Sequence, residues 1–112
     1  MQSQHRLHTA EEFRLLFSRG MFVDTPFFRL VWKKSSGLVC RFAFVASRGV
    51  SKRAVVRNLL RRRTREWYRR RMNLFRVPID LAVIFKREVV EVSRRVLYEE
   101  LERATKKILE RI

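Results

Sequence analysis

The chain has 112 residues, which is enough for one compact domain but too few for a second hydrophobic core. Hydrophobic residues make up 46% of it and include nine Phe and two Trp, a composition that argues against a disordered chain. Lys and Arg number 27 against 11 Asp and Glu, a net charge of +16, so the expected partner is a polyanion.

The apolar stretches are too short for a membrane span. The longest, such as residues 39–46, are interrupted by charges, here Arg41, whereas a spanning helix needs about 18 or more apolar residues. Residues 1–6 lack the apolar core of a secretory signal. The single cysteine, Cys40, lies in an apolar run and has no partner for a disulfide or a metal cluster. We therefore expect a cytoplasmic protein without membrane association, whose one thiol is buried and unreactive.

The first predicted element is a helix over residues 10–19, preceded by a flexible N-terminus over residues 1–8. Thr9 and Glu12 have the spacing of a capping box, in which each side chain accepts a hydrogen bond from the other residue's backbone amide. Apolar residues follow at helical spacing. Gly20 is expected to end this helix in the left-handed conformation.

Three strand-prone segments follow the first helix. Residues 27–33, just after Pro26, are aromatic and β-branched, and a short strand is expected before them at residues 21–23. Residues 34–37 have the composition of a turn, and residues 38–46 are again β-prone. The two longer segments are therefore expected to pair as an antiparallel hairpin.

The second half of the chain predicts two helices around one strand. A basic helix is expected over residues 51–72, which contain no Gly or Pro, with Ser51 as the candidate N-cap. Residues 79–85 form an almost continuous apolar run, typical of a central strand that is covered on both faces. Residues 97–108 repeat apolar side chains at helical spacing, which indicates a docking helix. The order αβββαβα predicts a single α+β domain over residues 1–112.

The basic helix concentrates the charge of the chain. Residues 48–71 contain eleven basic residues and one acidic residue, Glu66, a net charge of +10 out of +16. At about 100° per residue, one side of the helix gathers the apolar residues Val56, Leu59, Leu60 and Trp67. The opposite side gathers Asn58, Arg61, Arg62, Arg65 and Arg69, with Arg57 near its margin.

This cationic side does not have the pattern of an ordinary solvated helix. Solvated faces mix acidic and basic residues at i, i+4, whereas here arginine follows arginine at spacings where like charges repel. The planar fork of arginine matches pairs of phosphate oxygens, so phosphate is the expected ligand. Asn58 is either solvated or offers its amide group to RNA or to a hydrated metal ion. Arg63 falls on the apolar side and is expected to extend along the sheet edge.

At these residues the chain resembles the bacterial ribonuclease P protein family, whose hallmark is a pattern close to R-N-R-x-x-[KR]-x-x-R-E. Residues 47–55 also resemble the family's lead-in S-K-K-V-x-K-x-A-V, and the resemblance extends over roughly residues 5 to 110. Two departures are Leu59, in place of the second arginine of the trio, and Gly49, in place of a basic residue. Leu59 is expected to turn toward the apolar side. The matching positions in the helix are Arg57, Asn58, Arg62, Arg65 and Glu66, with Arg61 as a neighbouring basic residue.

The resemblance implies both a fold and an activity. The fold would be an α/β sandwich with a mixed sheet of about four strands and a left-handed βαβ crossover, similar to the second domain of ribosomal protein S5. The activity would be that of a ribonuclease P subunit that assists endonucleolytic removal of the 5′ leader from precursor tRNA. The catalytic chemistry would belong to the RNA subunit, which requires Mg²⁺, and one protein would bind one RNA. The resulting ribonucleoprotein would be cytoplasmic.

The resemblance also implies two sets of binding residues. Those expected to contact the RNA subunit are Arg48, Lys52, Arg53, Arg57, Asn58, Arg61, Arg62, Arg65 and Arg69. Those expected to hold the leader, in a cleft between the first helix and the sheet, are Phe13, Phe17, Arg29 and Val31. Aromatic faces stack on unpaired bases, and a positive side chain suits a leader phosphate. From spacing alone, Phe13 and Phe17 would be ordinary core residues.

No catalytic or metal site is expected within the protein itself. His5 and His8 lie near the terminus, and Asp24 and Asp80 are far apart in sequence without neighbouring acids, so neither acid–base catalysis nor a two-metal site is indicated. The main alternative is a ribosomal or general RNA-binding module without a role in tRNA processing. A DNA-binding protein is disfavoured because the basic helix has no helix-turn-helix partner and no dimerisation seam. A protein-only nuclease is the last alternative.

Overall fold

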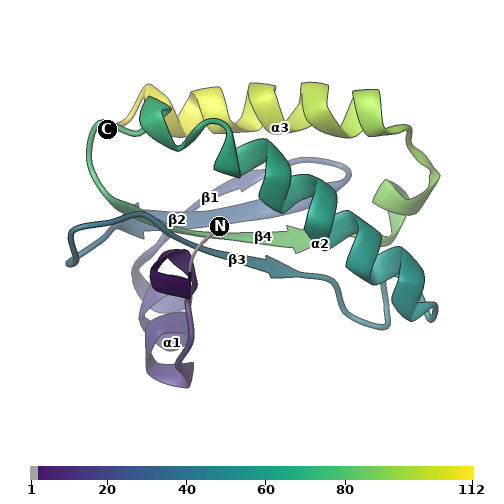
Figure 1. Ribbon diagram of the computed structural model, residues 1–112, viewed down its shortest axis with the longest axis horizontal. Helices are drawn as coiled ribbons and strands as arrows, with labels where there is room; N and C mark the ends of the chain where they lie inside the picture. The colour runs from purple at the N-terminus through teal and green to yellow at the C-terminus, as the bar shows by residue number, and fades with distance from the viewer. Residues whose placement is uncertain (1–2) are drawn as a thin grey trace.

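Residues 3–112, which the computed structural model describes, contain three α-helices and one four-stranded mixed sheet (Figure 1). The predicted order αβββαβα and the α+β class are confirmed. Short 3-10 helices cover Ser3–His5, Met72–Leu74 and Arg87–Glu91. The main elements are α1 (Ala10–Arg19), β1 (Met21–Asp24), β2 (Phe28–Lys34), β3 (Arg41–Val45), α2 (Ala54–Arg69), β4 (Ile79–Phe85) and α3 (Arg94–Leu109).

The strand order of the sheet is β1-β2-β4-β3. β2 pairs antiparallel with β1 and β4, while β3 runs parallel to β4, with α2 in the connection between them. The predicted hairpin of β2 with β3 is wrong, because β4 lies between these two strands. The central position of β4 was predicted correctly: six of its seven residues are buried, and only a central strand covered on both faces buries so continuous an apolar run.

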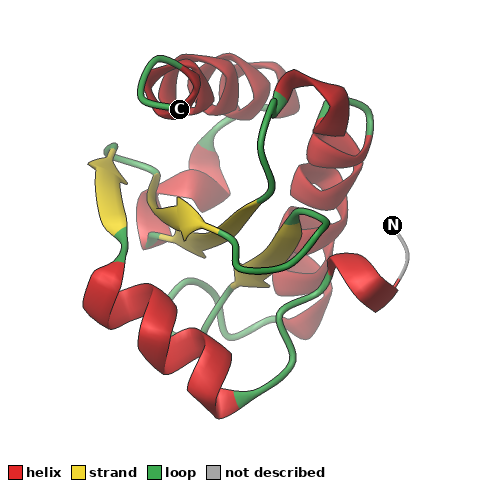
Figure 2. Ribbon diagram, turned by 90° about the vertical axis from the view of Figure 1, so that its left-hand side faces the viewer, coloured by secondary structure: helices red, strands yellow, loops and turns green. Residues whose placement is uncertain are grey.

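The helices cover opposite faces of this sheet (Figure 2). On the face covered by α2 and α3, large side chains such as Trp32, Phe42 and Leu81 form the main core. On the other face, which we call the α1 face, the smaller residues Val31, Ala43 and Ala82 pack with Leu7 and Leu16. Two long helices therefore cover one face of the sheet, whereas the N-terminal part of the chain, with α1, covers the other.

α1 begins with the predicted capping box and ends in a tight turn. The Thr9 hydroxyl accepts a hydrogen bond from the backbone amide of Glu12, and the Glu12 carboxylate accepts one from that of Thr9. Gly20 has φ −76° and ψ 161°, so the predicted left-handed conformation is wrong. Glycine is required here for space: a Cβ atom would lie 2.4 Å from the Leu16 carbonyl oxygen and 2.9 Å from Val31 Cγ1. The chain can therefore pass directly from α1 into β1.

α2 begins at Ala54, three residues later than predicted. Its N-cap is Arg53, which makes no side-chain capping bond, so the prediction of Ser51 as N-cap is wrong. Ser51 Oγ instead accepts a hydrogen bond from the Arg53 amide, inside the loop that precedes the helix. Val50 is buried in this loop, and its amide closes a turn on the Ser47 carbonyl. The chain needs these residues to leave β3 before the helix can start.

α3 packs against the sheet as the apolar repeat predicted. Its buried stripe contains Leu97, Leu101, Ala104 and Ile108, each 1% exposed or less. Ser93 caps the helix by accepting a hydrogen bond from the Val96 amide. In all of residues 3–112, no helix is both long enough and apolar enough to cross a membrane.

The N-terminal segment contacts the sheet edge at β3. The Leu7 amide donates to the Phe42 carbonyl oxygen at 3.1 Å, and His5 Nδ1 lies 2.8 Å from the Cys40 carbonyl oxygen. Leu7 is buried, although the sequence assigns residues 1–8 to a flexible terminus. Met1 and Gln2 of that range lie outside the described residues. Cys40 is buried as expected, and its burial raises the pKa of the thiol.

Candidate RNA-binding surfaces

The outward side of α2 and the loop before it form a strongly cationic surface. Asn58, Arg62 and Arg69 are exposed on the helix, and Arg48 and Lys52 are exposed on the loop. We call this the basic surface. It consists of the nine residues expected to contact the RNA subunit: Arg48, Lys52, Arg53, Arg57, Asn58, Arg61, Arg62, Arg65 and Arg69.

Two arginines of the basic surface also hold its loop in place. Arg57 Nη1 donates to the carbonyl oxygens of Ser51 and Lys52, at 2.9 and 3.0 Å. Arg61 donates to the Ala46 carbonyl oxygen at 2.9 Å and to Asn58 Oδ1 at 2.8 Å. Because carbonyl oxygens carry no net charge, these bonds fix the loop without neutralising either guanidinium. They also engage the side-chain oxygen of Asn58, which is therefore not simply solvated.

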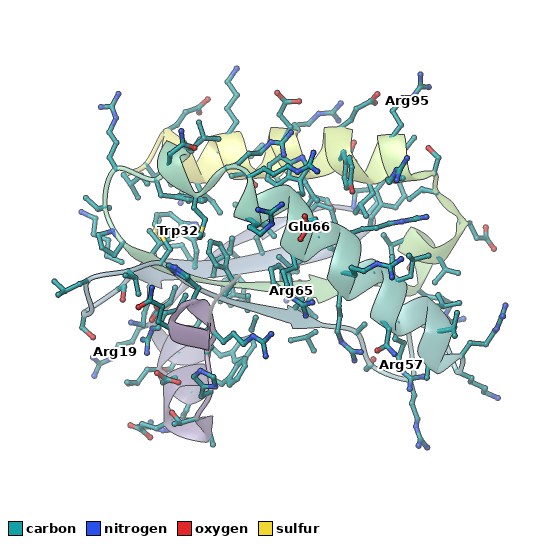
Figure 3. The ribbon with its side chains drawn as sticks, in the orientation of Figure 1. Arg19, Trp32, Arg57, Arg65, Glu66 and Arg95 are labelled. Atoms are coloured by element: carbon teal, nitrogen blue, oxygen red, sulfur yellow. The ribbon has the colours of Figure 1, made fainter. Side chains whose placement is uncertain are left out.

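Arg65 and Arg69 make different contacts on the two flanks of α2. The Arg65 guanidinium lies 5.9 Å from the centroid of the Phe44 ring, on the side of α2 that faces β3 (Figure 3). Arg69 pairs with Glu66 at 2.9 Å, and hydrogen bonding to Arg69 lowers the pKa of the Glu66 carboxyl. Both members of this pair are more than two-fifths exposed, so its contribution to stability is small.

The apolar side of α2 is centred differently from the prediction. Its buried residues are Leu60, Thr64, Trp67 and Tyr68. Leu59 is only half-buried and lines a groove between α2 and α3, so the expectation that it turns toward the apolar side is wrong. Arg63 lines the same groove and does not extend along the sheet edge. The residue that departs from the Arg-Asn-Arg trio therefore remains on the surface, beside Arg62.

The expected leader residues of α1 lie at the border of the smaller core. Phe13 and Phe17 have ring centroids 6.3 Å apart and an interplanar angle of 17°. Phe13 is half-buried and packs against the cluster of Leu16 and Val31, whereas 41% of Phe17 is exposed. The core interpretation therefore fits Phe13 in part, while Phe17 presents its ring to solvent.

The expected leader residues of β2 differ sharply in exposure. Arg29 is exposed and its guanidinium lies 5.5 Å from the centroid of the Phe22 ring. Val31 has no exposed surface, because α1 packs over it, so it cannot contact a ligand directly and the assignment of Val31 to this surface is corrected. Phe22, which sequence reasoning missed, is 51% exposed on the same face, since it pairs with Val31 in the sheet register. We call Phe13, Phe17, Phe22 and Arg29 the aromatic surface.

The comparison with known families decides the identity of this arrangement. A family model described as Ribonuclease P matches residues 1–109. The chain belongs to the ribonuclease P protein family. Two relatives named ribonuclease P protein component come from Azoarcus sp. (strain BH72) and Klebsiella pneumoniae (strain 342). The first is 33% identical, covering 87% of this chain and 80% of the relative, and the second is 32% identical, covering 88% and 82%.

Solved structures of the ribonuclease P protein share this fold. The protein from Staphylococcus aureus superposes with a TM-score of 0.86 at 19% identity, covering 93% of this chain and 94% of that one. The protein from Thermotoga maritima gives a TM-score of 0.77 at 25% identity, covering 96% of both chains. Family membership makes the chain a protein subunit of the ribonuclease P holoenzyme, with a role in tRNA 5′ processing alongside the RNA subunit.

Both aspartates of this ribonuclease P protein pair with cations. Asp80 is 1% exposed, and its carboxylate pairs with Arg41 at 2.8 Å and Lys33 at 3.3 Å. Asp24 pairs with Lys86 at 2.7 Å, and this bond lowers the pKa of the Asp24 carboxyl. Within residues 3–112, no three His, Cys, Asp or Glu side chains lie close enough together to hold a metal ion.

Proposed function

We propose that the chain binds the ribonuclease P RNA through the basic surface and the 5′ leader of precursor tRNA through the aromatic surface. In this arrangement the RNA subunit carries out the hydrolysis and holds the Mg²⁺ that the reaction requires. The protein's own side chains reduce the repulsion between two polyanionic RNAs and orient the leader. One protein would bind one RNA, in the cytoplasm.

One observation carries this proposal. Among the described residues, only Arg69 of the basic surface lies within ion-pair distance of a carboxylate. The other cations either contact carbonyl oxygens and rings or have no such neighbour, so their charge is available to phosphates. A general RNA-binding module would share this surface, but it would give no reason for four aromatic and cationic residues to gather on the opposite face of the sheet.

The basic surface can be tested with the variants Arg62→Ala and Arg65→Ala. Their affinity for a bacterial ribonuclease P RNA is measured at several salt concentrations. We expect each variant to bind more weakly and to reduce the salt slope by about one unit or less, because each removes one phosphate contact. Arg103→Ala is the matched control, since Arg103 is 71% exposed on α3 and pairs with Glu100. If Arg62→Ala binds the RNA with the affinity and the salt slope of the wild type, α2 is not part of the interface.

A further inference from the structure

α2 and α3 leave a groove between them to which the proposed function assigns no ligand. The two helices converge where the Tyr68 and Thr105 hydroxyl oxygens lie 2.8 Å apart, and they diverge toward their N-terminal ends (Figure 1). The groove has a volume of about 990 Å³. Its lining includes Arg62 and Arg63 from α2, Arg70 just after the end of α2, and Arg94, Arg95 and Tyr98 from α3.

The charge that lines this groove is unbalanced. Six arginines and three glutamates contribute to the lining. Glu66 pairs with Arg69, which lies outside the groove, and Glu99 is 3.6 Å from Arg95. In the part of the chain that the structure describes, no carboxylate lies within ion-pair distance of the other five arginines of the lining. These are Arg62, Arg63, Arg70, Arg71 and Arg94.

The position of these arginines is unfavourable in the free protein. Arg94 and Arg95 occupy the first turn of α3, which contains no acidic residue, and a cation at the N-terminus of a helix is disfavoured by the helix dipole. Arg62 and Arg63 bring further positive charge to the facing wall. An anion in the groove would relieve both the repulsion across it and the unfavourable dipole interaction.

The groove also offers a ring on which a base can stack. Tyr98 is half-buried, and no other aromatic ring of residues 3–112 stacks on it. The neighbouring Trp67 is already covered, because the Arg71 guanidinium lies 4.3 Å from its ring centroid and donates to the Trp67 carbonyl oxygen. Sites that bind single-stranded nucleic acid combine cations, which contact the phosphates, with aromatic rings, on which the bases stack. The groove has both features.

We propose that the α2–α3 groove binds an unpaired stretch of RNA, with Arg63 and Arg94 contacting phosphates from opposite walls and a base stacked on Tyr98. An unpaired strand fits better than a duplex, because paired bases remain stacked on one another and cannot reach a ring between two helices. The groove is separate from the aromatic surface, since α2 and α3 cover the sheet face opposite α1. It shares Arg62 with the basic surface.

The test uses the full chain and a fluorescein-labelled oligouridylate of about twelve nucleotides, with binding followed by anisotropy over a range of salt concentrations. Arg63→Ala and Arg94→Ala should each lower the salt slope by about 0.7. Tyr98→Ala should weaken binding by about fivefold or more, while Tyr98→Phe keeps the ring and the affinity. Arg103→Ala is again the control, since it lies outside the groove on the same helix.

Amide chemical shifts recorded with the same oligonucleotide locate the site. Shifts at Arg63, Arg94 and Tyr98 support the groove. Shifts confined to the α1 side of the sheet, with Arg63→Ala and Arg94→Ala binding as the wild type, overturn it. If Tyr98→Ala does not fold, the two arginine variants still decide the question. The assay contains no ribonuclease P RNA, so a negative result here leaves the proposed role of the basic surface standing, and the reverse also holds.

Discussion

Arg41 connects the helix that carries Phe13 and Phe17 to the sheet that carries Arg29. Its guanidinium forms two hydrogen bonds with Asp80, at 3.0 and 2.8 Å, and also pairs with Glu12 of α1. Hydrogen bonding to Asp80 raises the pKa of Arg41. Because Asp80 is buried, this network anchors α1, and with it Phe13 and Phe17 of the aromatic surface, to the sheet.

Glu12 should make the stability of this network depend on pH. Hydrogen bonds from the backbone amides of Thr9 and His8, together with the Arg41 charge, hold the pKa of Glu12 below its ordinary value of 4.5. A lowered folded-state pKa stabilises the fold above the unfolded-state value, and this stability is lost as the pH falls through the folded-state pKa. Urea unfolding between about pH 5 and pH 3 should therefore show a shallower loss for Glu12→Gln than for the wild type.

Glu11→Gln controls for the change in net charge, since Glu11 is an exposed carboxylate in the same helical turn and its side chain bonds to Arg14. The same dependence on pH in Glu12→Gln and in the wild type would show that Glu12 does not contribute in this way.

Phe17 is the residue on which the leader assignment can be tested most cleanly. Its ring is 41% exposed, so Phe17→Ala should leave the fold intact. We expect the holoenzyme to lose about fivefold or more of its preference for a leader-bearing precursor over mature tRNA, because one stacking contact is removed. Ser18→Ala, at a neighbouring exposed position of α1, is the control. A large drop in thermal stability with unchanged leader preference would favour a core role for this ring.

At the scale of elements, one buried hydrogen bond joins α2 to α3. Tyr68 is fully buried, its hydroxyl oxygen lies 2.8 Å from that of Thr105, and burial raises the pKa of the phenol. Tyr68→Phe leaves the Thr105 hydroxyl buried without this partner, so it should lower the free energy of unfolding by about 1–3 kcal/mol. The measurement is urea denaturation at neutral pH.

The double variant Tyr68→Phe with Thr105→Val tests the cause of that loss. Removing both hydroxyl groups leaves no polar atom of the pair unsatisfied, so most of the lost stability should return. A double variant that is less stable than the single one would assign the effect to packing around the ring.

Elements whose residues carry a local signal could be predicted from the sequence. The apolar run of β4 predicted both its bounds and its central position, and the Thr9–Glu12 spacing predicted the start of α1. The sequence could not exclude a β2–β3 hairpin. The turn composition of residues 34–37 indicates that the chain reverses there, but it does not indicate which strand then pairs with β2. That choice depends on β4, which is more than thirty residues further along the chain.

The candidate surfaces could be predicted only in part, for a similar reason. The α2 projection misplaced Leu59 and Arg63 because two polar residues, Thr64 and Tyr68, belong to the buried stripe and shift its centre. Val31 and Phe22 share one face, and only the sheet register and the position of α1 show that the first is covered and the second exposed.

At the scale of the whole molecule, the sheet separates the two surfaces that we propose to bind nucleic acid. The basic surface lies on the side of α2, and the aromatic surface lies on the side of α1. β3, at the edge of the sheet, contributes Phe44 beneath Arg65 on one side and Arg41 beside Glu12 on the other. In the proposed arrangement, the chain contacts the RNA subunit with one side while the other side remains open to the 5′ leader.

The most direct measurement is the rate at which a bacterial ribonuclease P RNA cleaves a precursor tRNA at low Mg²⁺, with and without this chain. Because the chain supplies cations that otherwise must come from solution, we predict faster cleavage in its presence, less stimulation by Arg62→Ala at limiting protein concentration, and no cleavage by the protein alone. A folded wild-type chain that stimulates none of several bacterial ribonuclease P RNAs would contradict the account.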